Sequence, residues 1–377
     1  MTPEQAAHNM ARALRLAERG RYTTHPNPRV GCVIVRDGEV VGEGFHQRAG
    51  EPHAEVHALR MAGTRARGAA MFVTLEPCSH HGRTPPCVEA VIAAGLRKVW
   101  VAMQDPNPRV AGRGIEKLRE AGIEVECGLG AAEAEALNRG FLARMRGGRP
   151  WVTLKLAASL DGRTAMASGE SRWISGEAAR ADVHRLRAEA GAVLTSSATV
   201  LADDPALTLR LPPDRLASLG LADEAAAVDG LLPLRQPDRI VLDGAARVPA
   251  TAKVWAGGAR RFWLTAQPAA APEGVGNLPV PAGAQGLSLP AALQVLAQHE
   301  VNAVLVECGP RLAGALLQQQ LVDEWMLYLA PSLLGDAARP LARLPGLERL
   351  DQKIGFRMQD VRKVGDDLRL TLLPEGA

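Results

Sequence analysis

The sequence predicts an α/β protein made of two domains. Apolar strand-like runs alternate with helical segments along the chain, which is the pattern of sheets covered by helices. Its 377 residues are more than one ordinary hydrophobic core accommodates. A polar stretch broken by glycines, at 144–150, separates two such series of elements. We therefore place the domains at 1–145 and 146–377.

The first half contains helices and strands in mixed order. Apolar residues at helical spacing predict a helix over 3–20. The Asp37-Gly38 pair predicts a hairpin turn between strands at 29–35 and 40–45. The remaining elements expected here are a helix from His53 to about Gly63, a strand at 71–75, a helix after Pro86, a strand at 98–102, a helix from about Ala111 and a strand near Glu124.

The second half restarts the alternation after the polar break. A helix is expected over 175–190, and the segments 212–236 and 266–288 are rich in Pro, Ala and Gly. Such composition is typical of insertions or long loops. The strands predicted in this half are 151–158, 192–195, 239–242, 261–264, 303–307 and 324–330.

Composition indicates a globular protein without a strongly charged surface. Hydrophobic residues make up 47% of the chain, and 44 Lys and Arg stand against 41 Asp and Glu. This balance gives no electrostatic argument for a nucleic-acid partner. We see no signal peptide and no apolar run of about 20 residues, so no membrane partner is expected. Five cysteines, an odd number, fit a reducing cytoplasm better than a disulfide framework.

One histidine and two cysteines form a candidate zinc site. His53, Cys78 and Cys87 supply three ligands and leave a fourth position for water, which distinguishes a catalytic zinc site from a closed structural one. Glu55 follows His53 by two residues and is suited to carry protons for that water. An H-x-E sequence followed by P-C and a second Cys is the pattern of zinc deaminases of bases.

The spacing of the two cysteines leaves one alternative open. Eight residues separate Cys78 from Cys87, where the common deaminase pattern has two, and this longer loop indicates one branch of these enzymes. A structural site with His80 or His81 as a fourth ligand is the competing interpretation. The other three cysteines are expected to be core or surface residues without a role in chemistry.

The chemistry of the second half is less distinct. Strand 303–307 leads through a glycine turn into a helix whose first amide groups could bind phosphate, with Arg311 nearby. The glycine spacing is not G-x-G-x-x-G, which argues against a Rossmann fold. Lys155, Ser159 and Asp161 gather near the end of strand 151–158. These residues alone do not establish a second active site.

The chain resembles the bifunctional riboflavin-biosynthesis enzymes that join a pyrimidine deaminase to a reductase. The resemblance covers nearly the whole chain outside the two long insertions and the last dozen residues, and the eight-residue gap between the cysteines makes it specific. The motifs that carry it are His25–Gly31, His53–Leu59, Thr74–Cys87, Asp105–Pro108, Ser159–Arg163 and Thr195–Pro205.

The resemblance implies a cytidine-deaminase-like three-layer domain followed by a dihydrofolate-reductase-like domain. The implied substrate is a small phosphorylated pyrimidine, 2,5-diamino-6-(5-phosphoribosylamino)pyrimidin-4-one. Zinc would activate a water, and Glu55 would take its proton and later protonate the departing ammonia. The residues implied to contact this substrate in the deaminase domain are Asn27, His46, His80 and Arg83.

For the second domain the resemblance implies hydride transfer from NADPH to C1′ of the ribosyl group, which reacts as its opened imine. We also expect a homo-oligomer. Gly244 departs from the family, which often has a serine or threonine there. The implied NADPH contacts are Ala157, Trp173, Thr199, Asp203, Gly309, Pro310, Arg311, Leu312, Ala313, Gly314 and Ala315. The implied substrate contacts are Ser171, Arg187, Leu207, Arg210 and Glu307.

Three other functions compete with this one. A deaminase of tRNA or nucleosides would leave the C-terminal domain without a known purpose, and the charge balance counts against it. A zinc-stabilised binding module would not need Glu55 for its function. A protein with only one active domain is the third possibility, although both sets of motifs look intact.

Overall fold

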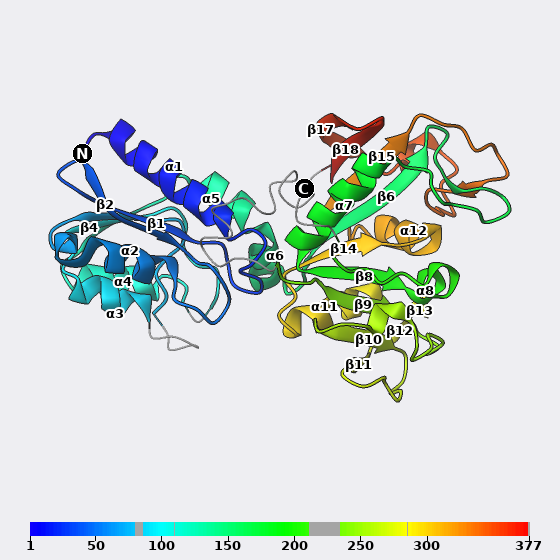
Figure 1. The fold of residues 1–377 in the computed structure, drawn as a ribbon, viewed down its shortest axis with the longest axis horizontal. Coiled ribbons are helices and arrows are strands. Elements are labelled where there is room, and N and C mark those ends of the chain that lie inside the picture. The colour runs from blue at the N-terminus through cyan, green and yellow to red at the C-terminus, as the bar shows by residue number, and fades with distance from the viewer. Residues whose placement is uncertain (80–85, 109, 211–233, 285, 376–377) are drawn as a thin grey trace. The chain divides into compact units, whose positions relative to one another are not determined.

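The structure is a computed structural model that describes residues 1–79, 86–108, 110–210, 234–284 and 286–375. It divides into two compact units, and the chain passes from the first to the second between Gly148 and Arg149 (Figure 1). This point lies inside the stretch 144–150 that separated the two series of elements in the sequence. Most of the expected insertion 212–236 lies outside the described residues.

The first unit is built on a five-stranded sheet in the order β2-β1-β3-β4-β5. β1 runs antiparallel to both β2 and β3, whereas β3, β4 and β5 are parallel. Asp37 and Gly38 have φ of 51° and 85°, as a tight hairpin requires, so the predicted turn is confirmed. The strands are β1 (Gly31–Arg36), β2 (Glu39–Phe45), β3 (Ala70–Val73), β4 (Lys98–Val101) and β5 (Glu124–Cys127).

Helices cover both faces of this sheet and give the unit three layers (Figure 1). A Cβ on Gly31 of β1 would lie 1.9 Å from the carbonyl oxygen of Ala13, so the glycine allows α1 to approach closely. Gly42 of β2 does the same for α2 on the opposite face. The helices are α1 (Pro3–Arg19), α2 (Ala54–Ala62), α3 (Cys87–Ala93), α4 (Arg113–Glu120), α5 (Ala131–Leu137) and α6 (Arg139–Gly147), with a 3₁₀ turn η1 (Gly63–Ala66).

The second unit is built on a nine-stranded sheet in the order β11-β10-β9-β8-β14-β6-β15-β18-β17. Its strands are parallel from β11 to β15, and the hairpin of β17 and β18 adds an antiparallel edge. The strands are β6 (Trp151–Ser159), β8 (Ala192–Ser196), β9 (Asp238–Leu242), β10 (Arg261–Thr265), β11 (Gly276–Pro279), β14 (Ala303–Glu307), β15 (Glu324–Ala330), β17 (Phe356–Val364) and β18 (Asp367–Pro374). Two short pairs join β7 (Arg163–Ala165) to β16 (Arg339–Pro340) and β12 (Ala282–Gly283) to β13 (Gly286–Leu287).

Separate hydrophobic clusters attach helices to this larger sheet. α11 and α12 pack on the side chains of β6, β8 and β14 that point to one face, and α7 packs on Leu305 of β14 and on Met326 and Tyr328 of β15 at the other face. In the described part of the chain, none of the helices has the length and apolarity needed to cross a membrane. The helices are α7 (Glu177–Ala190), α8 (Ser197–Asp203), α11 (Leu289–Gln298) and α12 (Pro310–Gln318), with 3₁₀ turns η2 (Lys253–Trp255) and η3 (Leu350–Gln352).

Several elements differ from those predicted. The polar stretch from 144 is partly helical because α6 continues to Gly147. The segment 266–288, expected as a loop, contributes the edge strand β11, which pairs with β10 although its Gly-Asn-Leu-Pro sequence is unusual for a strand. The hairpin of β17 and β18 was not predicted, because β17 is mostly exposed and its sequence lacks an apolar alternation.

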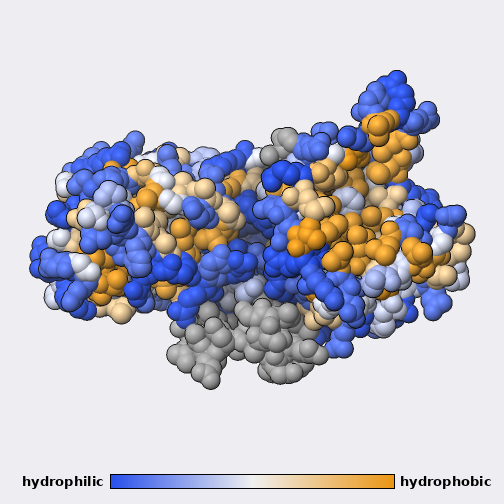
Figure 2. All heavy atoms as spheres, turned by 90° about the horizontal axis from the view of Figure 1, so that it is seen from above, coloured by the Kyte–Doolittle hydropathy of each residue, from blue (hydrophilic) through white to orange (hydrophobic). Residues whose placement is uncertain are grey.

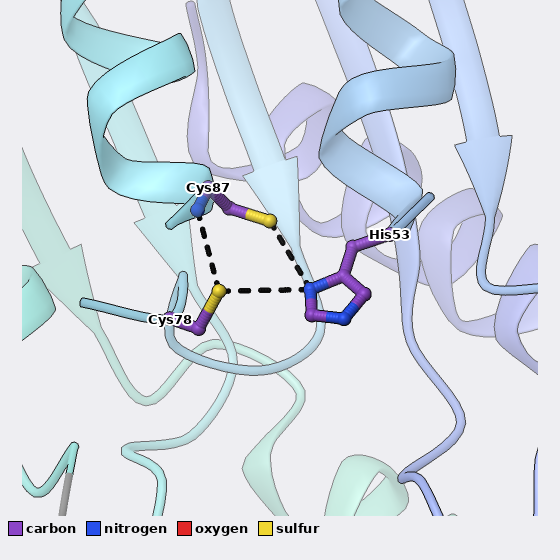
Figure 3. Close-up of side chains that lie close together, drawn as sticks. All are labelled: His53, Cys78 and Cys87. Atoms are coloured by element: carbon purple, nitrogen blue, oxygen red, sulfur yellow. Dashed lines mark hydrogen bonds between the residues drawn. The ribbon is translucent and has the colours of Figure 1, made fainter. Parts of the chain in front are cut away.

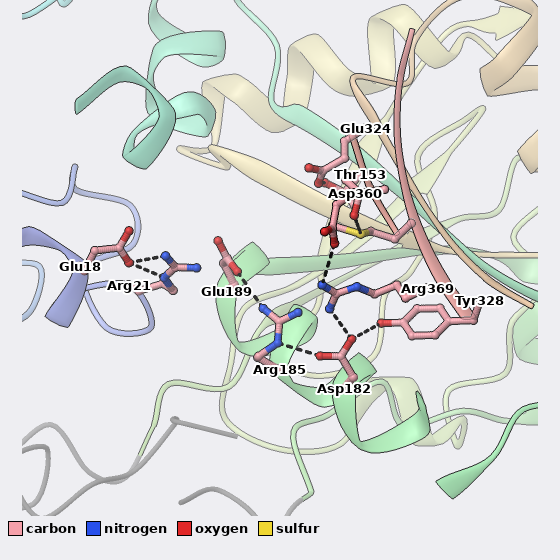
Figure 4. A network of polar contacts seen from close by, with 12 residues as sticks. Glu18, Arg21, Thr153, Asp182, Arg185, Glu189, Glu324, Tyr328, Asp360 and Arg369 are labelled. Carbon is pink, nitrogen blue, oxygen red and sulfur yellow. Dashed lines mark hydrogen bonds and ion pairs between the residues drawn. The ribbon is translucent and has the colours of Figure 1, made fainter. Parts of the chain in front are cut away.

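A buried ionic network ties α7 to the antiparallel edge of the second sheet (Figure 4). The carboxylate of Asp182 accepts hydrogen bonds from Tyr328 Oη at 2.6 Å, Arg369 Nη1 at 2.6 Å and Arg185 Nε at 2.8 Å. Arg369 also lies 3.7 Å from Asp360. Asp182 and Arg369 are both buried, so each charge depends on its partners for solvation.

Replacing Asp182 by alanine is therefore expected to destabilise the second unit by about 3–5 kcal/mol, because the buried Arg369 loses its nearest carboxylate. Urea unfolding followed by circular dichroism measures the change. Asp366→Ala is the control, since that carboxylate is exposed and its removal should change stability by less than about 0.5 kcal/mol. Equal stabilities of the two variants would contradict the prediction.

Candidate active sites

His53, Cys78 and Cys87 lie together where α2 and α3 begin (Figure 3). Nδ1 of His53 is 3.2 Å from Sγ of Cys87 and 3.6 Å from Sγ of Cys78. These separations suit a tetrahedral zinc ion, whose bonds to nitrogen and sulfur are about 2.0–2.3 Å long. Within the described ranges, no other group of His, Cys, Asp and Glu side chains is close enough to hold a metal ion. The residues present fit zinc.

The start of α3 places a hydrogen-bond donor at the sulfur of Cys78. The N–H of Cys87, the first residue of α3, donates to Sγ of Cys78 at 3.3 Å. Hydrogen bonding from the Cys87 thiol, together with His53, lowers the pKa of Cys78 to about 4. The same contact with Cys78, reinforced by burial, raises the pKa of Cys87 well above its usual value. Contacts with His53 and with the amide of Cys87 therefore favour the thiolate form of Cys78, and a bound cation would favour the thiolate form of both sulfurs.

Glu55 is buried beside these ligands in the first turn of α2. Its side chain is 3% exposed, and burial raises its pKa to about 7 although His53 opposes the shift. Oε2 is buried without a hydrogen-bond partner in the described structure. A carboxylate with a pKa near neutrality and an unused oxygen is suited to accept and return a proton.

Asn27 and His46 form a hydrogen-bonded pair next to the same site. His46 is 2% exposed, and burial lowers the pKa of its ring to about 4, so the ring is neutral. Nδ1 lies 3.2 Å from the carbonyl oxygen of Pro52 and must donate to it, which leaves Nε2 to accept from Nδ2 of Asn27 at 3.0 Å. Asn27 is therefore oriented with Oδ1 directed away from His46. The predicted contacts His80 and Arg83 lie outside the described residues.

In the second unit, Arg187 of α7 and Glu307 of β14 form a bidentate ion pair. Nε and Nη2 of Arg187 donate to the two oxygens of Glu307 at 2.6 and 2.9 Å. Nη1 also donates to the carbonyl oxygen of Thr208 at 3.1 Å, which brings the neighbouring Leu207 and Arg210 to the pair. The structure thus gathers four of the five predicted substrate contacts, while Ser171 lies half-buried after β7.

Lys155 belongs to this group of charges although the sequence assigned it no role. It stands opposite Glu307 in the register of β6 and β14, and its Nζ is 5.7 Å from the ring centre of Tyr328. Burial lowers the pKa of the amine. Asp161, by contrast, anchors a turn, because its carboxylate accepts from the amides of Leu334 and Gly335 at 3.1 and 2.8 Å. Only the register of β6 against β14 places Lys155 beside Glu307, and a single sequence does not reveal that register.

The residues predicted to contact NADPH lie near the carboxyl ends of adjacent parallel strands. α8, which carries Thr199 and Asp203, follows β8, and α12 follows β14, the next strand in the sheet. Gly309 caps α12 without a side-chain hydrogen bond, and a Cβ there would meet nothing within 4 Å. Trp173 is 70% exposed. In the described structure, a helix start without a side-chain cap and the open space beside Gly309 fit the diphosphate of a dinucleotide.

The Arg180 guanidinium lies 4.4 Å from the ring centre of Trp173 and steadies this exposed indole. Ala157 lies near the end of β6, on the strand next to β14. The remaining predicted contacts, 310–315, form the first turns of α12. The predicted cofactor residues therefore belong to β6, α8, α12 with its N-cap Gly309, or the turn that contains Trp173.

A His-Cys-Cys centre with a buried glutamate in a three-layer unit defines a zinc-dependent deaminase of the cytidine deaminase type, here joined to a second α/β unit. Two family models match the chain. The cytidine and deoxycytidylate deaminase zinc-binding region matches residues 3–103, and the RibD C-terminal domain matches residues 150–370.

Individual relatives agree with the family models. Riboflavin biosynthesis protein RibD of Escherichia coli is 56% identical over 371 residues, with 98% of this chain and 99% of that protein covered. The structure of Acinetobacter baumannii RibD superposes with a TM-score of 0.88 at 45% identity, covering 98% of this chain and 99% of that one. The chain belongs to the RibD family of riboflavin biosynthesis proteins. The expected deaminase-like and reductase-like domains are confirmed.

A structure from Thermotoga maritima carries the same two units. It superposes with a TM-score of 0.82 at 32% identity and covers 98% of this chain and 99% of that one. It is described as a diaminohydroxyphosphoribosylaminopyrimidine deaminase and 5-amino-6-(5-phosphoribosylamino)uracil reductase.

Purified protein is expected to contain about one zinc ion per chain, bound by the three ligands named above. Cys78→Ser should lose most of this zinc, because serine replaces a thiolate by a poorly ionised hydroxyl. Cys127→Ser is the matched control, since Cys127 is exposed and outside the centre. Mass spectrometry of the metal content tests the prediction, and full zinc content in Cys78→Ser would contradict it.

Proposed function

We propose that the protein catalyses two successive steps of riboflavin biosynthesis. The first is the zinc-dependent hydrolytic deamination of 2,5-diamino-6-(5-phosphoribosylamino)pyrimidin-4(3H)-one. The second is the NADPH-dependent reduction of the ribosyl group of the product to a ribityl group. The observation that supports the first step most strongly is the buried Glu55 next to three zinc ligands. The tRNA or nucleoside deaminase alternative is disfavoured, because the relatives match both halves of the chain.

The residues of the first unit would each have a separate role in deamination. Zinc held by His53, Cys78 and Cys87 would lower the pKa of water to about 7. Glu55 would receive the proton of the attacking water at Oε2 and later give it to the nitrogen of the departing ammonia. Because His46 occupies the amide nitrogen of Asn27, Oδ1 of Asn27 would accept a hydrogen bond from an N–H group of the pyrimidine.

The residues of the second unit would position the phosphoribosyl product against NADPH, which supplies the hydride. The amides at the start of α12 would bind the diphosphate of the cofactor. Arg187 holds both oxygens of Glu307, so this carboxylate is fixed in place for contact with sugar hydroxyl groups. Arg210, which is exposed beside them, would contribute positive charge for the substrate.

A homo-oligomer and a cytoplasmic location remain predictions. Exposed apolar side chains gather on the second unit, where Figure 2 shows a broad hydrophobic area. Such areas often mark surfaces that associate with another protein. The large exposed apolar residues of this unit include Leu160, Met166, Leu333, Leu350 and Met358.

The proposed function is tested by the mass of the product. Incubation with the diaminopyrimidinone phosphate alone should replace one amino group by oxygen, and added NADPH should then add two hydrogen atoms. Deamination without subsequent reduction would refute the proposed role of the second unit. No reaction by folded, zinc-loaded protein would refute the substrate assignment.

Glu55→Gln should keep its zinc and lose deamination by about 10²–10⁴-fold, because an amide cannot carry the proton. Ammonia release measures this loss, and reduction of pre-deaminated substrate should continue at the normal rate. Glu89→Gln, an exposed change in α3, is the control. If Glu55→Gln retained its turnover, a zinc-stabilised binding module would be the better description of the first unit.

The pH dependence of deamination should show the ionisation of Glu55. The base must be deprotonated to act, so kcat/KM should rise with pH through the pKa of this group. Burial raises that pKa from 4.5 toward about 7, whereas the positive charge of zinc lowers it. The acidic limb should therefore fall between these values in rate measurements from pH 4 to 9. A rate independent of pH over this interval would exclude Glu55 as the base.

A further inference from the structure

Glu76 immediately precedes Pro77 and the zinc ligand Cys78, and its side chain is 3% exposed. Both carboxylate oxygens accept hydrogen bonds from backbone amides of a distant segment. Oε2 accepts from Asp105 at 3.1 Å and Gly112 at 3.0 Å. Oε1 accepts from Gly114 at 2.8 Å and Ile115 at 3.3 Å. One buried carboxylate therefore gathers four N–H groups that follow it by 29 to 39 residues.

The donor segment is shaped to surround this carboxylate. The Asp-Pro-Asn-Pro motif forms a turn in which the amide of Asn107 donates to Oδ1 of Asp105 at 2.8 Å. Gly112, with φ of 92°, then directs the chain into α4 as its N-cap residue, and no side chain of its own caps the helix. Glu76 takes that place, so the negative charge lies at the positive end of α4.

Other contacts hold the residues on both sides of Cys78 to the same segment. The amide of Glu76 donates to the carbonyl oxygen of Met103 at 3.0 Å. A Cβ on Gly114 would lie 2.2 Å from the carbonyl oxygen of Pro77, so the glycine lets α4 press against this peptide. Nζ of Lys117 donates to the carbonyl oxygen of Ser79 at 3.4 Å. Cys78 is the residue between these attachments.

We infer that Glu76 is a positioning residue of the metal centre, which fixes the backbone of Cys78 and so places its sulfur for zinc. The inference rests on the zinc site of the proposed function. A glutamine in its place would turn an NH₂ group toward two of the four N–H donors. These donors would lose their acceptor, and the Asp105–Ile115 segment would no longer hold Pro77 and Cys78 in one position.

The test uses the full-length protein with Glu76→Gln, and Glu116→Gln as control, since Glu116 is exposed in the first turn of the same helix. Two readouts report on the centre itself: the rate at which EDTA removes zinc, and the absorption of the Co²⁺-substituted protein. Glu76→Gln is expected to lose zinc about tenfold faster, at the low end of the effect of residues that support metal ligands. Its sulfur-to-cobalt absorption should shift, whereas its reductase rate should stay unchanged.

A second variant guards against misfolding of the first. Gly114→Ala keeps the carboxylate but pushes the Pro77 peptide away, and it should also speed zinc loss; it decides the matter if Glu76→Gln does not fold. Zinc loss and cobalt spectra equal to those of Glu116→Gln would overturn the inference and leave Glu76 as a helix cap only, even if the protein melted at a lower temperature. A wild-type protein that bound no zinc would instead refute the proposed function.

Discussion

The deaminase site depends on how closely α2 lies against β2. Cβ atoms on Gly42 and Gly44 would stand 2.2 Å and 2.5 Å from atoms of α2, so only glycine permits this approach. Glu55 lies in the first turn of this helix, and its side chain is buried. Burial disfavours the charged form, and this brings the pKa into the range in which a proton is both taken and released.

In the second unit, by contrast, a buried carboxylate is paired with a guanidinium. Glu307 and Arg187 are withdrawn from water together, and each oxygen of the carboxylate has its own N–H donor. Burial opposes the ionisation of Glu307, but the Arg187 guanidinium keeps the pKa of this group below its usual value. The carboxylate therefore stays charged and fixed, in contrast to Glu55, which is left with a free oxygen. The environment of Glu307 suits a residue that holds the substrate, and the environment of Glu55 suits a residue that carries a proton.

The sequence predicted that His53, Cys78 and Cys87 lie together, because zinc chemistry depends on residue type and on short spacing. It also predicted most strands of both sheets, whose apolar runs are buried on both faces. It missed β17, whose side chains are mostly exposed, and the short helices α5 and α6, which bury few apolar side chains. The sequence did not predict the contacts of Lys155 and Glu76 for another reason. Their partners come from other strands or from a turn some thirty residues away, so only the folded chain shows the contacts.

The loop around Glu76 has a consequence for how this family can vary. Its four donors are backbone amides, which every residue other than proline possesses. Side chains in the loop can therefore change through evolutionary drift while the hydrogen bonds persist. The exceptions are Asp105, whose carboxylate accepts the amide of Asn107, and two glycines: Gly112 adopts a left-handed conformation, and Gly114 lies against Pro77. The weak points of a metal centre supported in this way therefore include two positions that bear no functional group at all.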